Sequence, residues 1–158
     1  MLAALTLIQN NQIHRKIYLY DTYEGMPEPT DKDIDLHGVP YRLLWKKEKE
    51  LLTVSLDEVK NNMLSTGYPK ENIIFVKGMV EKTIPRTLPN KIALLRLDTD
   101  LYESTYHELI HLYPKVTTQG VSSAASDVYK RQPVESILFF TSSRETVRSS
   151  FSFFQSRR

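Results

Sequence analysis

The sequence predicts an α/β fold with a parallel sheet, because helical and strand-like segments alternate through the first 120 residues. Three short apolar runs suit buried strands, namely residues 16–21, 72–77 and 91–98. Helical patterns lie between them and beside them, at residues 2–10, 55–66 and 102–113. A chain of 158 residues has room for one ordinary domain, so these segments are assigned to a single domain.

The ends of the predicted helices are marked by particular residues. The inward face of the first helix is expected to carry Leu2, Leu5 and Ile8. Ser55 and Glu58 form a capping box at the start of the second helix, and Gly67 is placed to end it. Pro114 should end the third helix, and residues 120–121 should open the next strand.

Two predicted strands end in an acid, Asp21 and Asp98. Ligands of open α/β sheets bind beyond the carboxyl ends of the strands, so both acids are candidate site residues. An ionised carboxylate has only acceptors, which suits the two hydroxyls of a ribose, and this chemistry is the reason to consider Asp21. The alternative is that Asp21 only begins a turn, since aspartate favours turns. It opens a long loop, residues 22–40, that is rich in proline and acids and is expected to be functional.

Asp98 and Asp100 place two carboxylates at the mouth of the most apolar strand. Mg²⁺ takes one or two carboxylates and keeps the remaining positions for water or substrate oxygens. A metal there could lower the pKa of a sugar hydroxyl. The alternative is that Asp100 caps the next helix. We expect Asp98 to bind the metal and Asp100 to lie nearer the cap.

Composition excludes several other classes of protein. The chain is 41% hydrophobic and 25% charged, which is ordinary for a globular domain and argues against disorder. It has no cysteine, hence no disulfide and no thiolate metal site, and no apolar run long enough for a transmembrane helix is expected. The first residues lack the features of a signal peptide, so a cytoplasmic location is predicted and no membrane partner.

His107 and His111 have a spacing that can hold zinc, but they are interpreted as a surface pair.

Residues 122–158 differ from the rest of the chain. They carry six basic and three acidic residues, against 15 and 16 in residues 1–121, so the net charge of +2 comes from the tail and predicts no nucleic-acid partner. Residues 122–132 have no strand or helix period, and they match a possible translation of a transposase-library sequencing adapter. We interpret 1–121 as a partial domain and 122–158 as an artefactual or disordered tail. The alternative is a serine-rich linker followed by a helix.

Five segments carry a resemblance to a known family. They are DTYEGMPEP at 21–29, DLH at 35–37, SLDEVKNN at 55–62, GMVEKTIP at 78–85 and LRLDTDLYEST at 95–105. The first resembles the D-[ST]-[FY]-x-G-[ML]-P-x-P loop, and the last the L-R-[LI]-D-[GT]-D-x-Y-E-S-T signature, of the macrocin O-methyltransferase family. The resemblance covers about two-thirds of the chain.

This resemblance implies a Rossmann-like class I methyltransferase fold, with an incomplete parallel sheet flanked by helices. It implies methyl transfer from S-adenosylmethionine to a sugar hydroxyl of a small-molecule glycoside, assisted by Mg²⁺, and it leaves a homo-oligomer open. The cofactor-binding residues that it implies are Asp21, Thr22, Gly78 and Met79. Asp21 would hold the ribose, Gly78 and Met79 would lie near the adenine, and Asp98 would bind the metal.

The resemblance also implies parts that lie outside this sequence. The family's first strand and glycine loop would precede residue 1, and further acidic metal ligands would follow residue 121. The chain is therefore interpreted as a fragment that is inactive as given. Two alternatives stay open: a non-catalytic remnant that binds a nucleotide or a partner, and a different α/β enzyme. The signature at residues 95–105 argues against the second.

Overall fold

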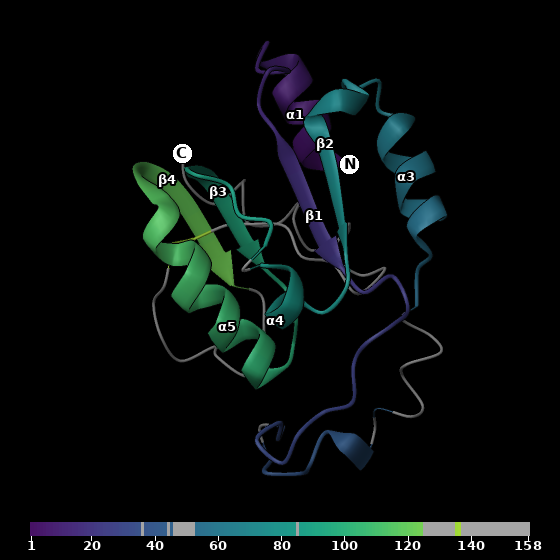
Figure 1. Cartoon of the computed structure of the whole chain (residues 1–158), viewed down its shortest axis with the longest axis vertical. Helices are drawn as coiled ribbons and strands as arrows, with labels where there is room; N and C mark the ends of the chain where they lie inside the picture. The colour runs from purple at the N-terminus through teal and green to yellow at the C-terminus, as the bar shows by residue number, and fades with distance from the viewer. Residues whose placement is uncertain (36, 44, 46–52, 85, 125–134, 137–158) are drawn as a thin grey trace.

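The computed structural model describes all residues except 36, 44, 46–52, 85, 125–134 and 137–158. Helices and strands alternate along the chain, as Figure 1 shows, and this order confirms the predicted α/β class. The helices are α1 (Leu2–Gln9), α3 (Leu56–Leu64), α4 (Val80–Thr83) and α5 (Tyr102–Leu112), with short 3₁₀ turns at Lys70–Asn72 and Tyr113–Lys115. The strands are β1 (Ile17–Asp21), β2 (Ile73–Lys77), β3 (Ile92–Leu97), β4 (Val116–Ala124) and β5 (Glu135–Ser136).

The strands form two pieces of parallel sheet. β1 pairs with β2 so that Asp21 lies opposite Lys77, and β3 pairs with β4. β5 adds a short antiparallel contact to the outer edge of β4. The arrows of β1 to β4 point the same way in Figure 1, so the carboxyl ends of all four strands gather at one edge of the molecule.

The fourth strand differs from the prediction. It begins at Val116 instead of residue 120, and it includes residues 122–124, which were expected to lack a strand. The physical reason is that a strand is held by backbone pairing, here Leu95 with Ser122 and Leu97 with Ala124, and this pairing does not require apolar side chains. Apart from β5, the rest of the tail lies outside the described residues, so the interpretation of residues 122–158 stays a prediction.

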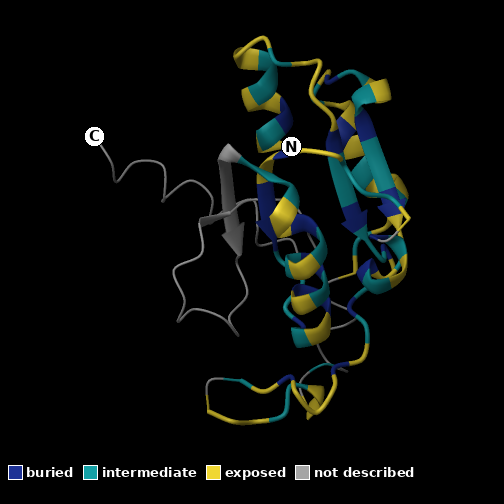
Figure 2. Ribbon diagram, turned by 60° about the vertical axis from the view of Figure 1, so that its left-hand side comes forward, coloured by how far each residue is buried: buried dark blue, intermediate teal, exposed yellow. Residues whose placement is uncertain are grey.

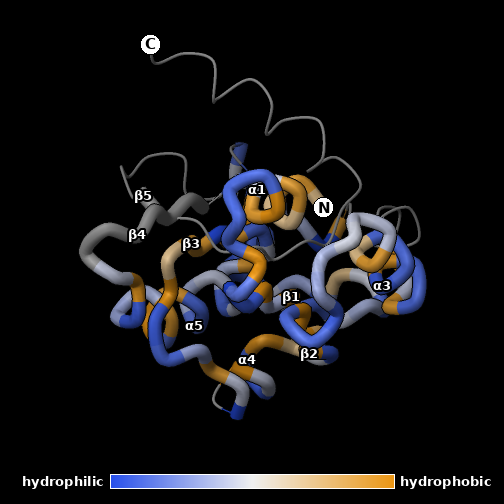
Figure 3. The backbone as a smooth tube through the Cα atoms, turned by 90° about the horizontal axis from the view of Figure 1, so that it is seen from above, coloured by the Kyte–Doolittle hydropathy of each residue, from blue (hydrophilic) through white to orange (hydrophobic). Residues whose placement is uncertain are grey.

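Two hydrophobic clusters hold the helices on the strands. The larger one joins both pieces of sheet to α4 and α5, and its buried members are Tyr20, Val76, Val80, Ile84, Ile92, Leu95, Leu97 and Leu112. The smaller one packs α1 and α3 on β1 and β2, through Ala4, Ile17, Met63, Tyr68 and Ile73. Figure 3 shows α1 and α4 on opposite sides of the β1–β2 pair. In Figure 2 the buried residues follow the strands and the inner helix faces, and the long loop at the bottom is largely exposed.

The predicted face of α1 is partly wrong. Leu2 and Leu5 are 47% and 41% exposed, whereas Ala4 is fully buried and Ile8 packs on the smaller cluster. The helix is apolar on most sides, so its periodicity did not single out the buried face.

The predicted helix ends are largely confirmed. The Ser55 side chain accepts a hydrogen bond from the Glu58 backbone N–H at 3.2 Å, and Gly67 follows the helix with φ of +76°. Pro114 lies in the 3₁₀ turn that ends α5. Within the described residues, no helix combines the length and the apolar character needed to cross a bilayer.

Candidate functional site

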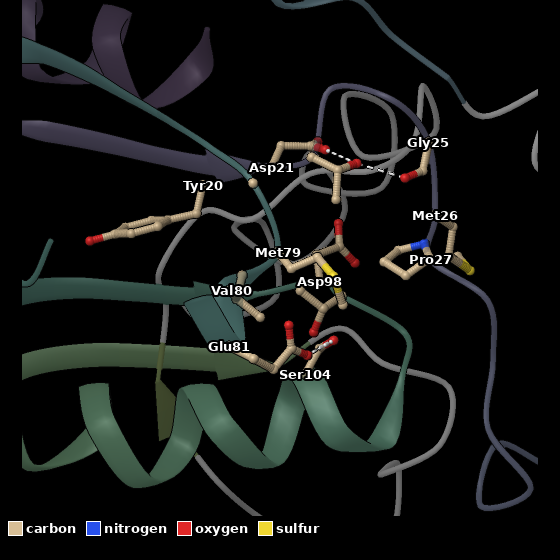
Figure 4. Close-up of a pocket in the computed structure, with 13 residues that line it drawn as sticks. Tyr20, Asp21, Gly25, Met26, Pro27, Met79, Val80, Glu81, Asp98 and Ser104 are labelled. Atoms are coloured by element: carbon tan, nitrogen blue, oxygen red, sulfur yellow. Dashed lines mark hydrogen bonds between the residues drawn. The ribbon is translucent and has the colours of Figure 1, made fainter. Parts of the chain in front are cut away.

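A pocket of about 440 Å³, which includes space open to solvent, lies at the carboxyl ends of β1, β2 and β3. All five predicted site residues line it: Asp21, Thr22, Gly78, Met79 and Asp98. The rest of the wall comes from the long loop and from the starts of α4 and α5, through Tyr20, Gly25, Met26, Pro27, Val80, Glu81, Thr99 and Ser104. In Figure 4 Asp21 lies at one end of the pocket, Glu81 and Ser104 lie at the other, and Met79 and Asp98 lie between them.

Asp21 ends β1 and uses one carboxylate oxygen to shape the turn that follows. Its Oδ1 accepts a hydrogen bond from the Tyr23 backbone N–H at 2.8 Å and lies 3.4 Å from the Thr22 hydroxyl oxygen. Both of these contacts use Oδ1. Burial raises the pKa of Asp21, and the hydrogen bonds from Tyr23 and Thr22 oppose the rise. The turn interpretation is thus confirmed, while the binding role stays a prediction.

Thr22 is largely occupied by the loop itself. Its hydroxyl donates to the Gly25 carbonyl at 2.6 Å and accepts from the Glu24 backbone N–H at 3.3 Å. Lys77, at the end of β2, pairs with Glu24 at 2.7 Å and ties the same turn to the neighbouring strand. Thr22 therefore holds the shape of the pocket wall, and its contact with a cofactor stays a prediction.

Gly78 is required by its backbone. Its φ of +133° suits glycine, and a Cβ atom there would lie 3.0 Å from the Thr83 Cγ2 atom. The Gly78 N–H donates to the Asp21 carbonyl at 2.9 Å, which extends the pairing of β1 and β2 to the pocket edge. Next to it, Met79 is 38% exposed and presents an apolar surface to the pocket.

Asp98 is already paired with a cation of the chain. Its Oδ2 accepts from the Arg96 guanidinium at 2.7 Å, and both side chains are nearly buried. Burial lowers the pKa of Arg96, and the nearby carboxylates of Asp98 and Asp100 oppose that shift. Within the described residues, no three His, Cys, Asp or Glu side chains gather into a metal-binding group.

Asp100 lies one residue before the cap of α5, nearer to it than Asp98, but it does not occupy the cap position itself. The N-cap position of α5 is Leu101, and no side chain of the cap residue bonds to the helix. Asp100 has φ of +59°, a left-handed conformation that turns the chain between β3 and α5. The capping acceptor comes from elsewhere in the chain.

Asp33, in the long loop, supplies that acceptor. Its Oδ1 accepts from the Tyr102 backbone N–H at 2.7 Å, and its Oδ2 accepts from the Thr30 N–H at 2.6 Å and the Thr30 hydroxyl at 2.9 Å. Asp33 is 2% exposed. Lys32 pairs with Glu103 at 2.5 Å beside it, so the loop is fastened to the start of α5. No local pattern marks this contact in the sequence, because the partners are 69 residues apart.

Two glutamates were not predicted, Glu81 in the pocket lining and Glu108 behind it. Glu81 accepts a hydrogen bond from the Ser104 hydroxyl at 2.7 Å, and Glu108 accepts one from the Thr99 hydroxyl at 3.1 Å. Glu108 is fully buried on the inner face of α5. The spacing of Ser104, Glu108 and Leu112, four residues apart, was the available sign that a glutamate would face inward.

The histidine pair differs from its interpretation as a surface pair. His107 and His111 are half-buried, with ring centroids 4.1 Å apart. The His111 Nδ1 atom lies 2.8 Å from the His107 carbonyl, which fixes the second ring on the helix. In the described part of the chain, no third ligand joins them in a metal-binding group.

Glu108 is expected to make stability depend on pH. Burial raises its pKa well above the ordinary 4.5. A carboxyl group whose pKa is higher in the folded state than in the unfolded state stabilises the fold at pH values below the unfolded-state pKa. This stabilisation is lost as the pH rises toward the folded-state pKa. The free energy of unfolding should therefore fall by up to about 1.4 kcal/mol per pH unit from 4.5 upward. Denaturant unfolding at several pH values should show a shallower slope for Glu108→Gln, and equal slopes would contradict a neutral Glu108.

Comparisons with known proteins show the family of this chain. The sequence profile of the family described as Macrocin-O-methyltransferase (TylF) matches residues 1–137. The 8-demethyl-8-(2,3-dimethoxy-alpha-L-rhamnosyl)-tetracenomycin-C 4'-O-methyltransferase of Streptomyces olivaceus is 32% identical over 106 residues, which are 67% of this chain and 40% of that protein. Demethyldecarbamoylnovobiocin O-methyltransferase of Streptomyces niveus is 31% identical over 106 residues, 67% of this chain and 39% of that protein. The chain spans about two-fifths of the length of these relatives.

Solved structures show the same fold. The O-methyltransferase NovP matches with a TM-score of 0.58 at 30% identity, over 72% of this chain and 48% of that one. The calicheamicin methyltransferase CalS11 matches with a TM-score of 0.56 at 23% identity, over 76% and 50% of the two chains, and supports the fold alone. These likenesses confirm the predicted Rossmann-like methyltransferase fold. Since the family profile covers most of its length, the chain belongs to the macrocin-O-methyltransferase family.

Proposed function

We propose that this chain binds S-adenosylmethionine in the pocket and that the protein transfers its methyl group to a sugar hydroxyl. The supporting observation is that residues from three strand ends, Asp21, Gly78 and Asp98, line one pocket. Strand ends of this kind are where open α/β sheets bind ligands. Membership of a methyltransferase family supports S-adenosylmethionine as the methyl donor.

A glycoside is the proposed acceptor class. The Streptomyces olivaceus relative is named for a rhamnosyl compound that it methylates on oxygen. The pocket is open to solvent, and its walls combine apolar and acidic side chains, as in many small-molecule sites. A polar acceptor such as a sugar suits the acidic part of this wall.

The residues of the pocket fit the proposed methyl donor. Asp21 has a carboxylate oxygen to accept from ribose hydroxyls, and Gly78 leaves the backbone open to close approach. Met79 and Met26 offer apolar contact to a purine ring. When bound, S-adenosylmethionine supplies an electrophilic methyl group on a sulfonium centre. The chain's own contribution would be to hold donor and acceptor in line and to exclude water.

Magnesium fits the described residues poorly. Asp98 is paired with Arg96, and Mg²⁺ prefers a set of oxygen ligands that the described residues do not gather. No step of the proposed reaction therefore passes through a metal. Asp98 as a ligand, and Mg²⁺ assistance of the reaction, stay predictions from the family resemblance.

The proposal is tested by titrating the 158-residue chain with S-adenosylhomocysteine in a calorimeter, with and without Mg²⁺. Saturable binding supports the proposed pocket.

A second assay follows labelled methyl transfer from S-adenosylmethionine to methyl α-L-rhamnoside. Binding without transfer favours the alternative of a non-catalytic binding remnant and fits the prediction that the chain is inactive as given. An absence of binding would sink the proposal.

Three further expectations stay predictions. A cytoplasmic location was inferred from the composition and the start of the chain. The absence of nucleic-acid and membrane partners was inferred from charge and hydropathy. A homo-oligomer was left open by the family resemblance. Size-exclusion chromatography with light scattering would test the last of these.

A further inference from the structure

Glu81 is a pocket residue whose second oxygen has no partner. It lies on α4, and its Oε1 accepts a hydrogen bond from the buried Ser104 hydroxyl at 2.7 Å. Its Oε2 is shielded from water and has no hydrogen-bond partner among the described residues. Figure 4 shows Glu81 on the α5 side of the pocket, opposite Asp21.

An acceptor of this kind is costly unless something binds to it. A buried polar atom without a partner costs roughly 1–3 kcal/mol, more if it is charged, and native proteins contain few such atoms. The Ser104 bond fixes the carboxylate but satisfies one of its two oxygens. Rotation about the last torsion of glutamate is soft, so a small turn would present Oε2 to the pocket.

The groups around Glu81 limit what could satisfy it. Glu108 and His107 face it from α5, and Asp98 lies at the end of β3. Burial favours the neutral form of Glu108 and lowers the pKa of His107. No lysine or arginine lines the pocket, so an ion pair within the described residues does not satisfy Oε2. His107 Nε2 and Glu108 Oε1 also have no partner among the described residues, so the remaining donors are a ligand in the pocket, the His107 ring or a proton shared with Glu108.

We propose that Glu81 recognises a ligand in the pocket by accepting a hydrogen bond from an N–H or O–H group through Oε2. A carboxylate has only acceptors, so it selects ligands that carry a donor at this point. The donor belongs either to the purine amino group of the methyl donor or to a hydroxyl of the sugar acceptor. This inference rests on the proposed function, and it adds a specificity-determining residue at the end of the pocket opposite Asp21.

The test compares ligands that differ by one donor. Adenosine, purine riboside (which lacks the 6-amino group) and methyl α-L-rhamnoside are titrated into the full chain and into Glu81→Met. Met keeps the bulk of the side chain and removes both acceptors. Glu81→Gln is the second variant, since its single amide oxygen retains part of the acceptor function. Glu71→Gln, an exposed site on the turn before β2, is the matched control.

The expected result is a loss of about tenfold in affinity for the ligand that donates to Glu81, because hydrogen bonds to charged groups contribute about this much. If Glu81→Met reduces the ratio of adenosine affinity to purine riboside affinity, the donor is the purine amino group. Weaker rhamnoside binding with that preference unchanged assigns it to the sugar. If wild type binds S-adenosylhomocysteine and Glu81→Met alters neither probe, the inference is overturned while the proposed function stands. If wild type binds no nucleoside, both fail.

Discussion

Replacing Asp33 by alanine is expected to lower the free energy of unfolding by about 3 kcal/mol. The carboxylate is almost fully buried and accepts three hydrogen bonds, from the Tyr102 N–H and from the N–H and hydroxyl of Thr30. Bonds to a charged acceptor contribute roughly 1.5–3 kcal/mol each, and part of this is recovered when water reaches the opened groups. The carboxylate also lies at the start of α5, where the helix dipole favours negative charge.

Asp31→Ala is the matched control for this experiment. Asp31 lies two residues away in the same loop and pairs with Arg42 at 2.9 Å, but its side chain is 86% exposed. Exposed pairs contribute between about 0 and 1 kcal/mol, so this variant should unfold close to wild type. Urea unfolding of both variants measures the difference. Equal losses in the two variants would mean that Asp33 does not fasten the loop to α5.

The loop held by Asp33 carries part of the pocket wall. Met26 and Pro27 precede it in the loop and line the pocket, and Asp98 lies four residues before Tyr102. Asp33→Ala should therefore also increase hydrogen exchange at the Tyr102 amide, because its acceptor is lost. The hydrogen bond between Asp33 and Tyr102 therefore stabilises the fold and also holds the segment that follows Asp98.

The regular part of the fold was predictable because it depends on local patterns. The three apolar runs fall within one residue of β1, β2 and β3, since each run is a short apolar stretch that can be recognised from its own residues. β4 was placed wrongly because its pairing with β3 comes from backbone hydrogen bonds with residues about 25 positions earlier in the chain. The face of α1 was misassigned because an apolar helix does not show in its own sequence which side meets a partner.

The same distinction applies to the site. Asp21 and Asp98 could be predicted together because parallel strands bring their carboxyl ends to one edge, whereas Gly78 was implied by the family resemblance. Asp33, Glu81 and Glu108 were missed because their partners come from other elements and depend on tertiary packing. The left-handed backbone at Asp100 was likewise not predicted.

Replacing Asp21 by alanine is expected to weaken S-adenosylhomocysteine binding by about 100-fold. Two ribose hydroxyls donating to one carboxylate would contribute about 3 kcal/mol together, which corresponds to this factor. Calorimetric titration measures the change. Glu24→Gln is the control, since Glu24 lies in the same turn and pairs with Lys77 outside the pocket lining. A loss below about threefold in Asp21→Ala would exclude Asp21 as the ribose acceptor.

The pH dependence of binding gives an independent check on the same residue. Burial raises the pKa of Asp21 above the ordinary 3.8, and the acceptor role requires the ionised form. As pH falls through this raised value, the carboxyl takes up a proton and loses acceptor capacity, so affinity should fall in wild type. Fold stability responds with the opposite sign: the contribution of Asp21 is present below 3.8 and is lost as pH rises through the folded-state pKa. Asp21→Ala should bind weakly at every pH and should show no further fall in affinity at acid pH, because the titrating group is gone. If the affinity of the variant still falls at acid pH, another acid of the pocket is responsible.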